Sequence, residues 1–140
     1  MTLATLATII AGIQDEILTL ADIRLAPDVP PEQLAGGGVF AVVYPASGRF
    51  EQTTSDSRGQ GAHTLHLMVA TPQTNLRSDW ARIIALGTTV PNAILHGATL
   101  GGAILQSEQI RYTFGPLEWG GQQMFGWLFE IDVLTVGLIT

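Results

Sequence analysis

The alternation of apolar and polar residues near the C-terminal end is the feature that most constrains the fold. Large apolar residues occupy every second position from residue 125 to residue 133: Phe125, Trp127, Phe129, Ile131 and Val133. Successive side chains of a β-strand point to opposite faces, so this spacing predicts a long strand with one apolar face. Glu130 and Asp132 then lie together on the opposite face of that strand.

A second alternating stretch precedes this strand and predicts its partner. Residues 109–114 carry Ile110, Tyr112 and Phe114 on one side, with Arg111 and Thr113 on the other. The connecting segment 115–123, GPLEWGGQQ, contains a Gly-Pro and a Gly-Gly, which are turn formers. The two stretches therefore predict a two-stranded hairpin with its tip at 115–123.

The first half of the chain predicts a helix followed by two strands. Apolar residues recur at steps of three and four along one helical stripe: Leu3, Leu6, Ile10, Ile13, Ile17 and Leu20. Residues 39–47, VFAVVYPAS, are apolar at nearly every position, which favours a strand covered on both faces. Residues 63–70 predict a second strand that ends before a proline.

Two helices are expected next, over 78–87 with Ser78 as N-cap and over 91–96 with Pro91 in the first turn. With these two stretches taken as one helical region and followed by the hairpin, the order becomes α-β-β-α-β-β. It predicts one α+β domain over residues 1–140, with a mixed or antiparallel sheet of about four strands and helices packed on one face.

The polar segment 48–62, GRFEQTTSDSRGQGA, is longer than an ordinary hairpin loop. We expect it to be a flexible loop that becomes ordered against a neighbouring molecule. Arg49, Phe50 and Arg58 are its candidate contact residues.

Composition excludes several classes of function. The chain has no cysteine, which rules out disulfides, a thiolate nucleophile and thiolate-bound metals. It also has no lysine, so it cannot form a Walker A loop. Its six arginines are scattered among twelve carboxylates, which argues against tight binding of DNA. An acidic surface nevertheless suits a channel through which DNA slides.

Only 13% of the residues are charged, while 46% are hydrophobic. A typical globular domain has about a quarter of its residues charged. Either neutral polar residues cover the surface, or part of the surface is buried against other subunits. The apolar start of the chain has no basic residues and is interrupted by Gln14, Asp15 and Glu16, so we expect neither a signal peptide nor a membrane span.

The titratable residues form no recognisable catalytic group. His63 and His66 are three apart on a predicted strand, so they should point to opposite faces and cannot share one metal. The side chains of Glu130 and Asp132 should lie about 6.5–7 Å apart, a range that suits acid–base chemistry or a hard cation. No third ligand or base is near them in sequence, which favours a solvated or lumen-facing acidic face. We therefore expect no enzyme activity, no cofactor and no metal.

The C-terminal hairpin resembles that of the tail terminator (tail completion) proteins of long-tailed bacteriophages, within the lambda-type minor tail and neck proteins. The resemblance is carried by Phe114 to Gly121, FGPLEWGG, and by Phe125 to Phe129, FGWLF. The order of the predicted elements extends the similarity over most of the chain.

This resemblance implies a homohexameric ring that caps the tail tube and ends its polymerisation. It also implies contacts with the tail tube protein and with the head–tail connector or head-closure protein, in a virion assembled in the host cytoplasm. DNA would pass through the lumen without specific binding, and no membrane would be involved. The expected contact patches are the first helix, the 48–62 segment and the hairpin tip with Leu117, Glu118 and Trp119. Trp119 could instead fold back onto its own sheet.

Two other functions remain open. A different neck protein, such as a head-closure or connector subunit, would share the fold, the acidity and the ring. A small bacterial α+β enzyme or ligand-binding domain would instead predict a pocket with converging polar groups and a perturbed carboxylate, with Glu130 and Asp132 as the candidates.

Overall fold

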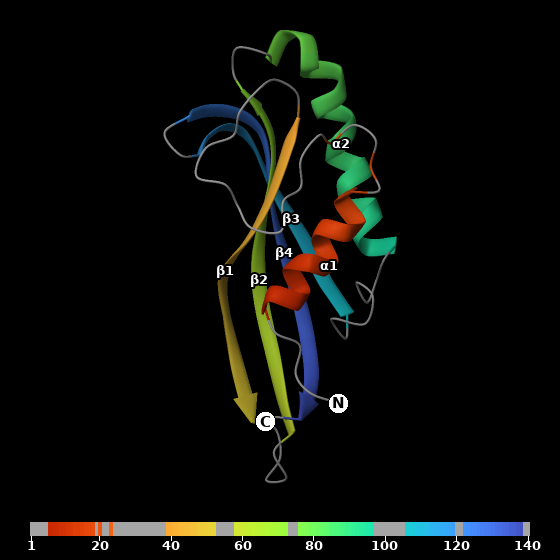
Figure 1. Ribbon diagram of the computed structural model, residues 1–140, viewed down its shortest axis with the longest axis vertical. Helices are drawn as coiled ribbons and strands as arrows, with labels where there is room; N and C mark the ends of the chain where they lie inside the picture. Colours follow the sequence, from red (N-terminus) through yellow and green to blue (C-terminus); the bar gives the residue numbers. More distant parts are fainter. Residues whose placement is uncertain are drawn as a thin grey trace.

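The computed structural model describes residues 6–18, 20, 23, 39–52, 58–72, 76–96, 106–119 and 122–138. Over these residues the elements are α1 (Leu6–Leu18), β1 (Phe40–Gln52), β2 (Arg58–Pro72), α2 (Leu76–His96), β3 (Gln106–Trp119) and β4 (Gln122–Leu138). The α+β class and the order α-β-β-α-β-β are confirmed. The strands form an antiparallel sheet in the order β1-β2-β4-β3, so β1 and β3 are its edge strands (Figure 1).

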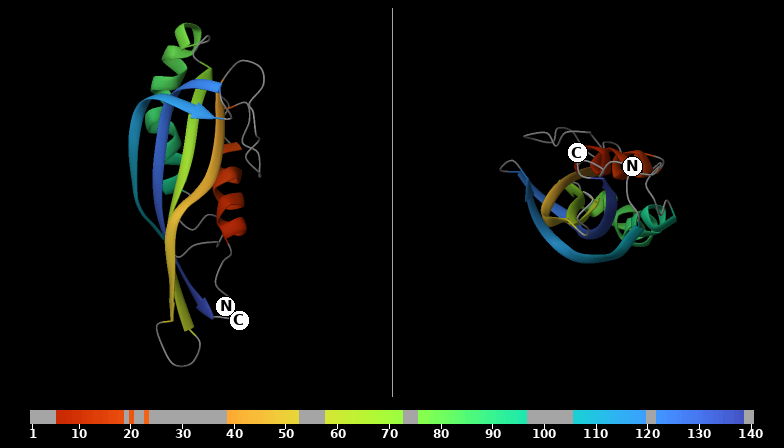
Figure 2. Two further views of the ribbon diagram at one scale, coloured as in Figure 1. Left: turned by 90° about the vertical axis from the view of Figure 1, so that its left-hand side faces the viewer. Right: turned by 90° about the horizontal axis from the view of Figure 1, so that it is seen from below.

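Both helices lie on the same face of the sheet and close the main core (Figures 1 and 2). α1 buries Ile9, Ile13 and Ile17, which are spaced one turn apart along the helix. α2 contributes a second buried stripe, and alternate residues of three strands complete the core. The residues are Ile83, Leu86, Val90 and Ile94 from α2, Val39, Ala41 and Val43 at β1, Leu65, Leu67 and Val69 from β2, and Phe129, Ile131 and Val133 from β4. The predicted apolar faces of these strands are confirmed.

A second, smaller apolar cluster lies on the opposite face of the sheet. Its buried members are Phe40, Val42, Met68, Ala70 and Met124, with Leu117 and Leu128 packed against them. The first half of β1 is therefore covered on both faces, as its continuous apolar run predicts.

A pair of glycines marks the bend that brings the β3–β4 hairpin end over this second cluster. Gly115 and Gly126 are opposite each other in the β3–β4 register, and Gly115 has a φ of 154°, which favours glycine. A Cβ on Gly126 would lie 2.3 Å from the carbonyl oxygen of Val69, so β2 approaches too closely for any side chain there. Beyond the pair, the hairpin end crosses over the sheet (Figure 2).

The strands are longer than the sequence pattern predicts. In the 48–62 segment, residues 48–52 pair with 59–63, and residues 53–57 are outside the described residues. The expected flexible loop is therefore mostly strand. The sequence did not reveal these strands, because β1 residues 48–51 are exposed on both faces and no buried apolar face marks them. The expected hairpin tip at 115–123 is likewise mostly strand, since β3 extends to Trp119 and β4 begins at Gln122.

α2 also differs from the prediction, because a single helix replaces the two expected over 78–87 and 91–96. Pro91 lies inside it, at a cost of about 3 kcal/mol for a proline in a helix interior. The helix continues because Val90 and Ile94, on either side of the proline, are fully buried in the core. Among the described residues, neither helix has the length and apolar character needed to cross a membrane.

Candidate interaction surface

Polar side chains form two rows across the sheet, on the face opposite the helices. The pairing register aligns one residue from each strand in the first row: Tyr44, His66, Glu130 and Arg111. The neighbouring row contains Ser47, Thr64, Asp132 and Gln109. We call these eight residues the polar ladder. Residues far apart in sequence therefore meet at adjacent positions on one surface.

Arg111 holds the two acidic residues of the ladder. Its Nη1 lies 2.5 Å from Oδ2 of Asp132, and its Nη2 lies 3.0 Å from Oε2 of Glu130. Thr64 donates a hydrogen bond of 2.7 Å from Oγ1 to Oδ1 of Asp132. Nε2 of His66 lies 4.0 Å from Oε1 of Glu130. Glu130 and Asp132 do share one face, as predicted, and Arg111 now supplies the partner that linear sequence spacing did not show.

These contacts stabilise the ionised form of Asp132. Burial acts to raise the pKa of this carboxyl, but hydrogen bonds from Arg111 and Thr64, with the positive charge of Arg111, outweigh it and hold the pKa below its usual value. The hydrogen bonds to Asp132 and then Glu130 raise the pKa of Arg111 in turn. Asp132 is therefore ionised at neutral pH, and a carboxylate shifted in this direction is poorly matched to acid–base catalysis there.

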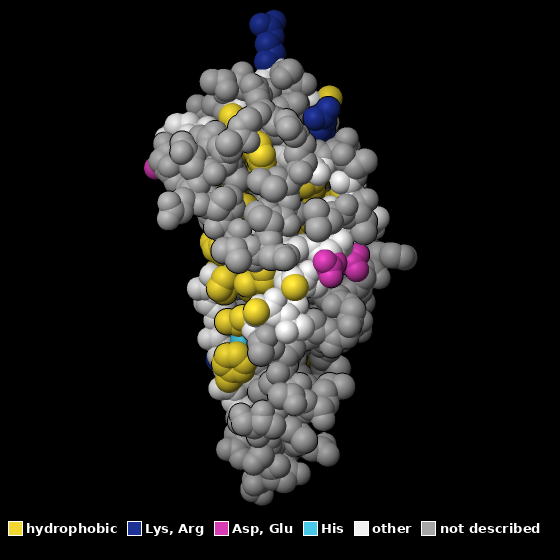
Figure 3. All heavy atoms as spheres, viewed as in Figure 1, with side chains coloured by type: hydrophobic (Ala, Val, Ile, Leu, Met, Phe, Trp, Pro, Cys, Tyr) yellow, Lys and Arg dark blue, Asp and Glu magenta, His cyan; other side chains and the backbone are white. Residues whose placement is uncertain are grey.

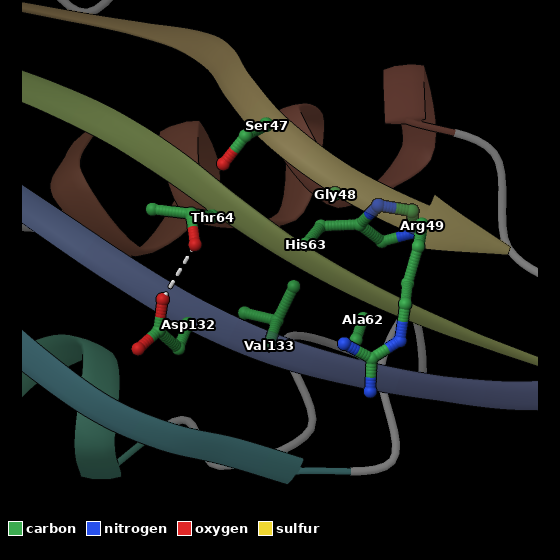
Figure 4. Close-up of a pocket in the computed structure, with 8 residues that line it drawn as sticks. All are labelled: Ser47, Gly48, Arg49, Ala62, His63, Thr64, Asp132 and Val133. Atoms are coloured by element: carbon green, nitrogen blue, oxygen red, sulfur yellow. Dashed lines mark hydrogen bonds between the residues drawn. The ribbon is translucent and has the colours of Figure 1, made fainter.

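An open pocket of about 350 Å³ lies beside the ladder. Ser47, Thr64 and Asp132 line it, with the Thr64 hydroxyl directed at Asp132 (Figure 4). The His63 imidazole lies against Gly48, away from that carboxylate (Figure 4). The carboxylate of Asp132, and not the His63 imidazole, is therefore the basic group next to the Thr64 hydroxyl. Within the described part of the chain, no cluster of three or more His, Asp or Glu side chains could hold a metal ion.

The two histidines lie on opposite faces of β2, as predicted. His66 contacts Tyr44 within the ladder, with ring centroids 5.4 Å apart. His63 is buried on the helix-bearing face, where its ring packs 4.6 Å from that of Phe50. Burial lowers the pKa of His63, and its Nε2 has no hydrogen-bond partner among the described residues.

Two glycines make room for the His63 ring. A Cβ on Gly48 would lie 2.5 Å from Nδ1, and a Cβ on Gly61 would lie 2.6 Å from Nε2. His63 is thus a structural residue of this part of the sheet, fitted into a space that its neighbours on β1 and β2 leave open.

The predicted contact residues fall into three groups. Phe50 and Arg49 are exposed on β1, where Arg49 forms a 2.7 Å ion pair with Glu51. Glu118 is also exposed, whereas Leu117 packs on the second apolar cluster of the same chain. The side chains of Arg58 and Trp119 are outside the described residues.

Further exposed apolar residues lie on α2 and in the middle of β3, at positions that the sequence did not predict as contacts. Trp80, Ile84 and Leu95 are exposed on α2, and Tyr112 is exposed on β3. Trp80 and Ile84 are one helical turn apart, off the buried stripe of α2, a spacing that could have identified them. Figure 3 shows apolar side chains reaching the surface on the side that carries α1.

Aromatic contacts join these exposed residues to the core. Tyr112 packs edge-on against Trp127 at 5.1 Å, and Trp80 approaches Phe114 at 6.0 Å. Trp127 donates a hydrogen bond of 2.7 Å from Nε1 to the carbonyl oxygen of Ile83, which fixes α2 against β4. The exposed rings are therefore held in place rather than free to turn inward.

No protein-family model and no curated protein sequence matches this chain.

Proposed function

We propose that this chain is a structural subunit of a phage tail, forming a homohexameric ring that caps the tail tube, ends its polymerisation and provides the surface for joining the head. The proposal combines the α-β-β-α-β-β order with the resemblance of the C-terminal hairpin to tail terminator proteins. Its partners would be further copies of itself, the tail tube protein and the connector or head-closure protein.

One observation carries the assembly part of the proposal. Among the described residues, a single copy exposes five large hydrophobic side chains on three separate elements: Phe50 on β1, Trp80, Ile84 and Leu95 on α2, and Tyr112 on β3. A closed cyclic ring uses two different patches on each subunit, one for each neighbour. Exposed apolar groups on opposite edges of one sheet suit that requirement, as does a chain in which only 13% of residues are charged.

The polar ladder fits the inner wall of such a ring. Two carboxylates and one guanidinium leave it with a net negative charge, which repels DNA phosphates and disfavours sticking. The ladder is also on the face that the helices leave uncovered. In the proposed ring the helices form the outside, and Glu130 and Asp132 face the lumen.

The alternative of another neck protein differs only in its position in the virion. A small enzyme or ligand-binding domain would use the pocket beside Asp132. The lowered pKa of Asp132 and its ion pair with Arg111 make that carboxylate a weak candidate for a general acid or base at neutral pH.

Particles produced without this protein provide the direct test. We expect electron microscopy to show overlong tails, or tails without heads, because nothing would stop tube growth or form the joint. Tails of normal length joined to heads would contradict the terminator role. Overlong tails joined to heads would retain the terminator role and contradict the joining role.

Native mass spectrometry tests assembly separately. We expect a species of six subunits, formed in solution or on added tube ends. A chain that stays monomeric in both conditions and binds a metabolite would contradict the proposal and favour the enzyme or binding-domain alternative.

A further inference from the structure

The two edge strands of the sheet run in opposite directions. β1 is antiparallel to β2, β2 is antiparallel to β4, and β4 is antiparallel to β3. β1 therefore runs parallel to β4 and opposite to β3. If a second copy continues the sheet with its helices on the same side, its β3 lies beside β1 in the antiparallel orientation, which is the arrangement of every other pair in this sheet.

The exposed part of β1 limits where such a contact can form. Residues 39–43 are buried, whereas residues 45–51 are all exposed. Phe50 in this exposed half has 59% of its surface exposed, and Tyr112 on the opposite edge strand has 66%. They are the two most exposed large hydrophobic residues among those described. Both lie on the helix-bearing face, because Phe50 contacts His63 and Tyr112 contacts Trp127.

We propose that β1 of one copy pairs with β3 of the next, with Phe50 opposite Tyr112 of the next copy. Each exposed edge strand is thus paired with an edge strand of another copy of this chain. This inference rests on the proposed ring and names the strands, the register and the residues that join its subunits.

Charge selects this register over its neighbours. With Phe50 opposite Tyr112, antiparallel pairing places Glu51 opposite Arg111 of the next copy. A shift by two residues in one direction places Arg49 opposite Arg111, a repulsive pair of like charges. A shift by two in the other direction places Glu51 opposite Thr113 and leaves no pair of opposite charges. A shift by one residue moves every side chain of one strand to the wrong face.

The same register also matches residue size and continues the polar ladder. Gly48 lies opposite Phe114 of the next copy, a small residue beside a large ring. Arg111 then lies between Glu51 of the neighbouring copy and Glu130 of its own copy, so negative and positive charges alternate along the row. The polar faces of successive subunits form one continuous surface, with the helices on the other side.

The proposed pairing offsets each copy along the strand direction. In a single sheet, Tyr112 shares a row with Phe129, Leu67 and Val43. Phe50 lies further along β1 than Val43, so its pairing with Tyr112 of the next copy is staggered. A sheet that closes on itself requires a stagger of this kind. Because the contact joins two different edges, it can repeat around a ring.

Disulfide cross-linking tests this register, and the chain has no cysteine of its own to interfere. The test uses the full-length double variant Phe50→Cys/Tyr112→Cys under mild oxidation. Directly opposite residues of antiparallel strands have Cα atoms about 4.5–5.5 Å apart, within the range of about 4.4–6.8 Å that a disulfide spans. On a non-reducing gel we expect a series of covalent oligomers that ends at six subunits. Each single variant should give no covalent oligomers.

A second pair keeps the exposed aromatic residues in place. Arg49→Cys/Thr113→Cys follows the same register on the opposite face and should also cross-link. The matched control Glu51→Cys/Tyr112→Cys puts the two cysteines on opposite faces and should not. Cross-linking of this control at the same rate, or covalent dimers from Phe50→Cys alone, would overturn the inference, the latter by showing that two β1 edges meet each other.

The outcomes separate this inference from the proposed function. Six-subunit rings in native mass spectrometry, with no cross-linking of either matched pair, would overturn the strand register and leave the ring intact. A chain that forms no ring in solution or on tube ends would overturn the proposed function itself.

Discussion

The two halves of β1 have the same secondary structure and opposite surroundings. Residues 39–43 are buried on both faces, against the helices on one side and the second apolar cluster on the other. Residues 45–51, beyond a register shift between Pro45 and Ser47, are all exposed. One continuous strand therefore serves the core at one end and presents a surface at the other. The difference shows that strand formation and core formation are separate properties of this sheet.

Matched phenylalanines at the two ends provide the largest expected contrast. Phe40 is 3% exposed, and Phe40→Ala should lower the free energy of unfolding by about 3–5 kcal/mol, because it leaves a cavity in the second cluster. Phe50→Ala should cost about 1 kcal/mol or less, since it removes only an exposed ring and its contact with His63. Urea unfolding of both variants measures the contrast. Equal losses would show that the exposed half of β1 is part of the core after all.

A smaller contrast comes from adding one methyl group beside the buried half of β1, where Gly126 aligns with Ala70 and Phe40, and one within the exposed half. Gly126→Ala should lower the free energy of unfolding by about 1–3 kcal/mol, because the new Cβ meets the backbone of Val69 and Ala70. Ser47→Thr adds a methyl group at an exposed position and should change stability by about 0.5 kcal/mol or less. Thermal unfolding followed by circular dichroism compares the two. A stable Gly126→Ala protein would mean that the hairpin bend does not need a glycine there.

The pH dependence of stability has the smallest expected effect and concerns His63, the buried β2 residue that pairs with Gly48 in the exposed half of β1. Burial lowers the pKa of His63 from its ordinary value of 6.5, so the unfolded chain binds this proton more readily than the folded one. The contribution of His63 to the free energy of unfolding is therefore constant above pH 6.5. It falls as the pH drops below 6.5 and levels off below the lowered folded pKa.

Urea unfolding of the parent protein and of His63→Leu between pH 8 and pH 5 isolates this contribution. The variant should lose less stability on acidification than the parent. If the free energy of unfolding falls equally with pH in both proteins, the end of the sheet around His63 opens before the rest unfolds. The two halves of β1 would then differ in stability as well as in burial.

Local patterns in the sequence were enough to predict the elements and their faces. The period-two spacing of Phe125 to Val133 placed Glu130 and Asp132 on one surface, and the structure agrees. The three-residue spacing of His63 and His66 likewise placed them on opposite faces. These predictions succeeded because the side-chain direction in a strand depends only on the local backbone.

Predictions that depended on polarity alone were wrong. The segment 48–62 looked like a loop because, apart from Phe50, its residues are polar or small, yet most of it is paired strand. Leu117 was expected on a turn because it lies between turn-forming glycines, yet it lies on β3 and is partly buried against the second cluster. In both cases the backbone pairing of long strands outweighed the local composition, since each added pair satisfies hydrogen bonds that a loop would leave to solvent.

The sequence by itself determined the α+β class, the order of the elements and the faces of the strands, because these follow from the spacing of apolar residues along the chain. Only the tertiary structure decided that Arg111 holds Glu130 and Asp132, and that Phe50 and Tyr112 lie on opposite edges of the same sheet face. Those relations depend on strand order and register between segments far apart in sequence. They arise from packing and pairing that no local pattern encodes.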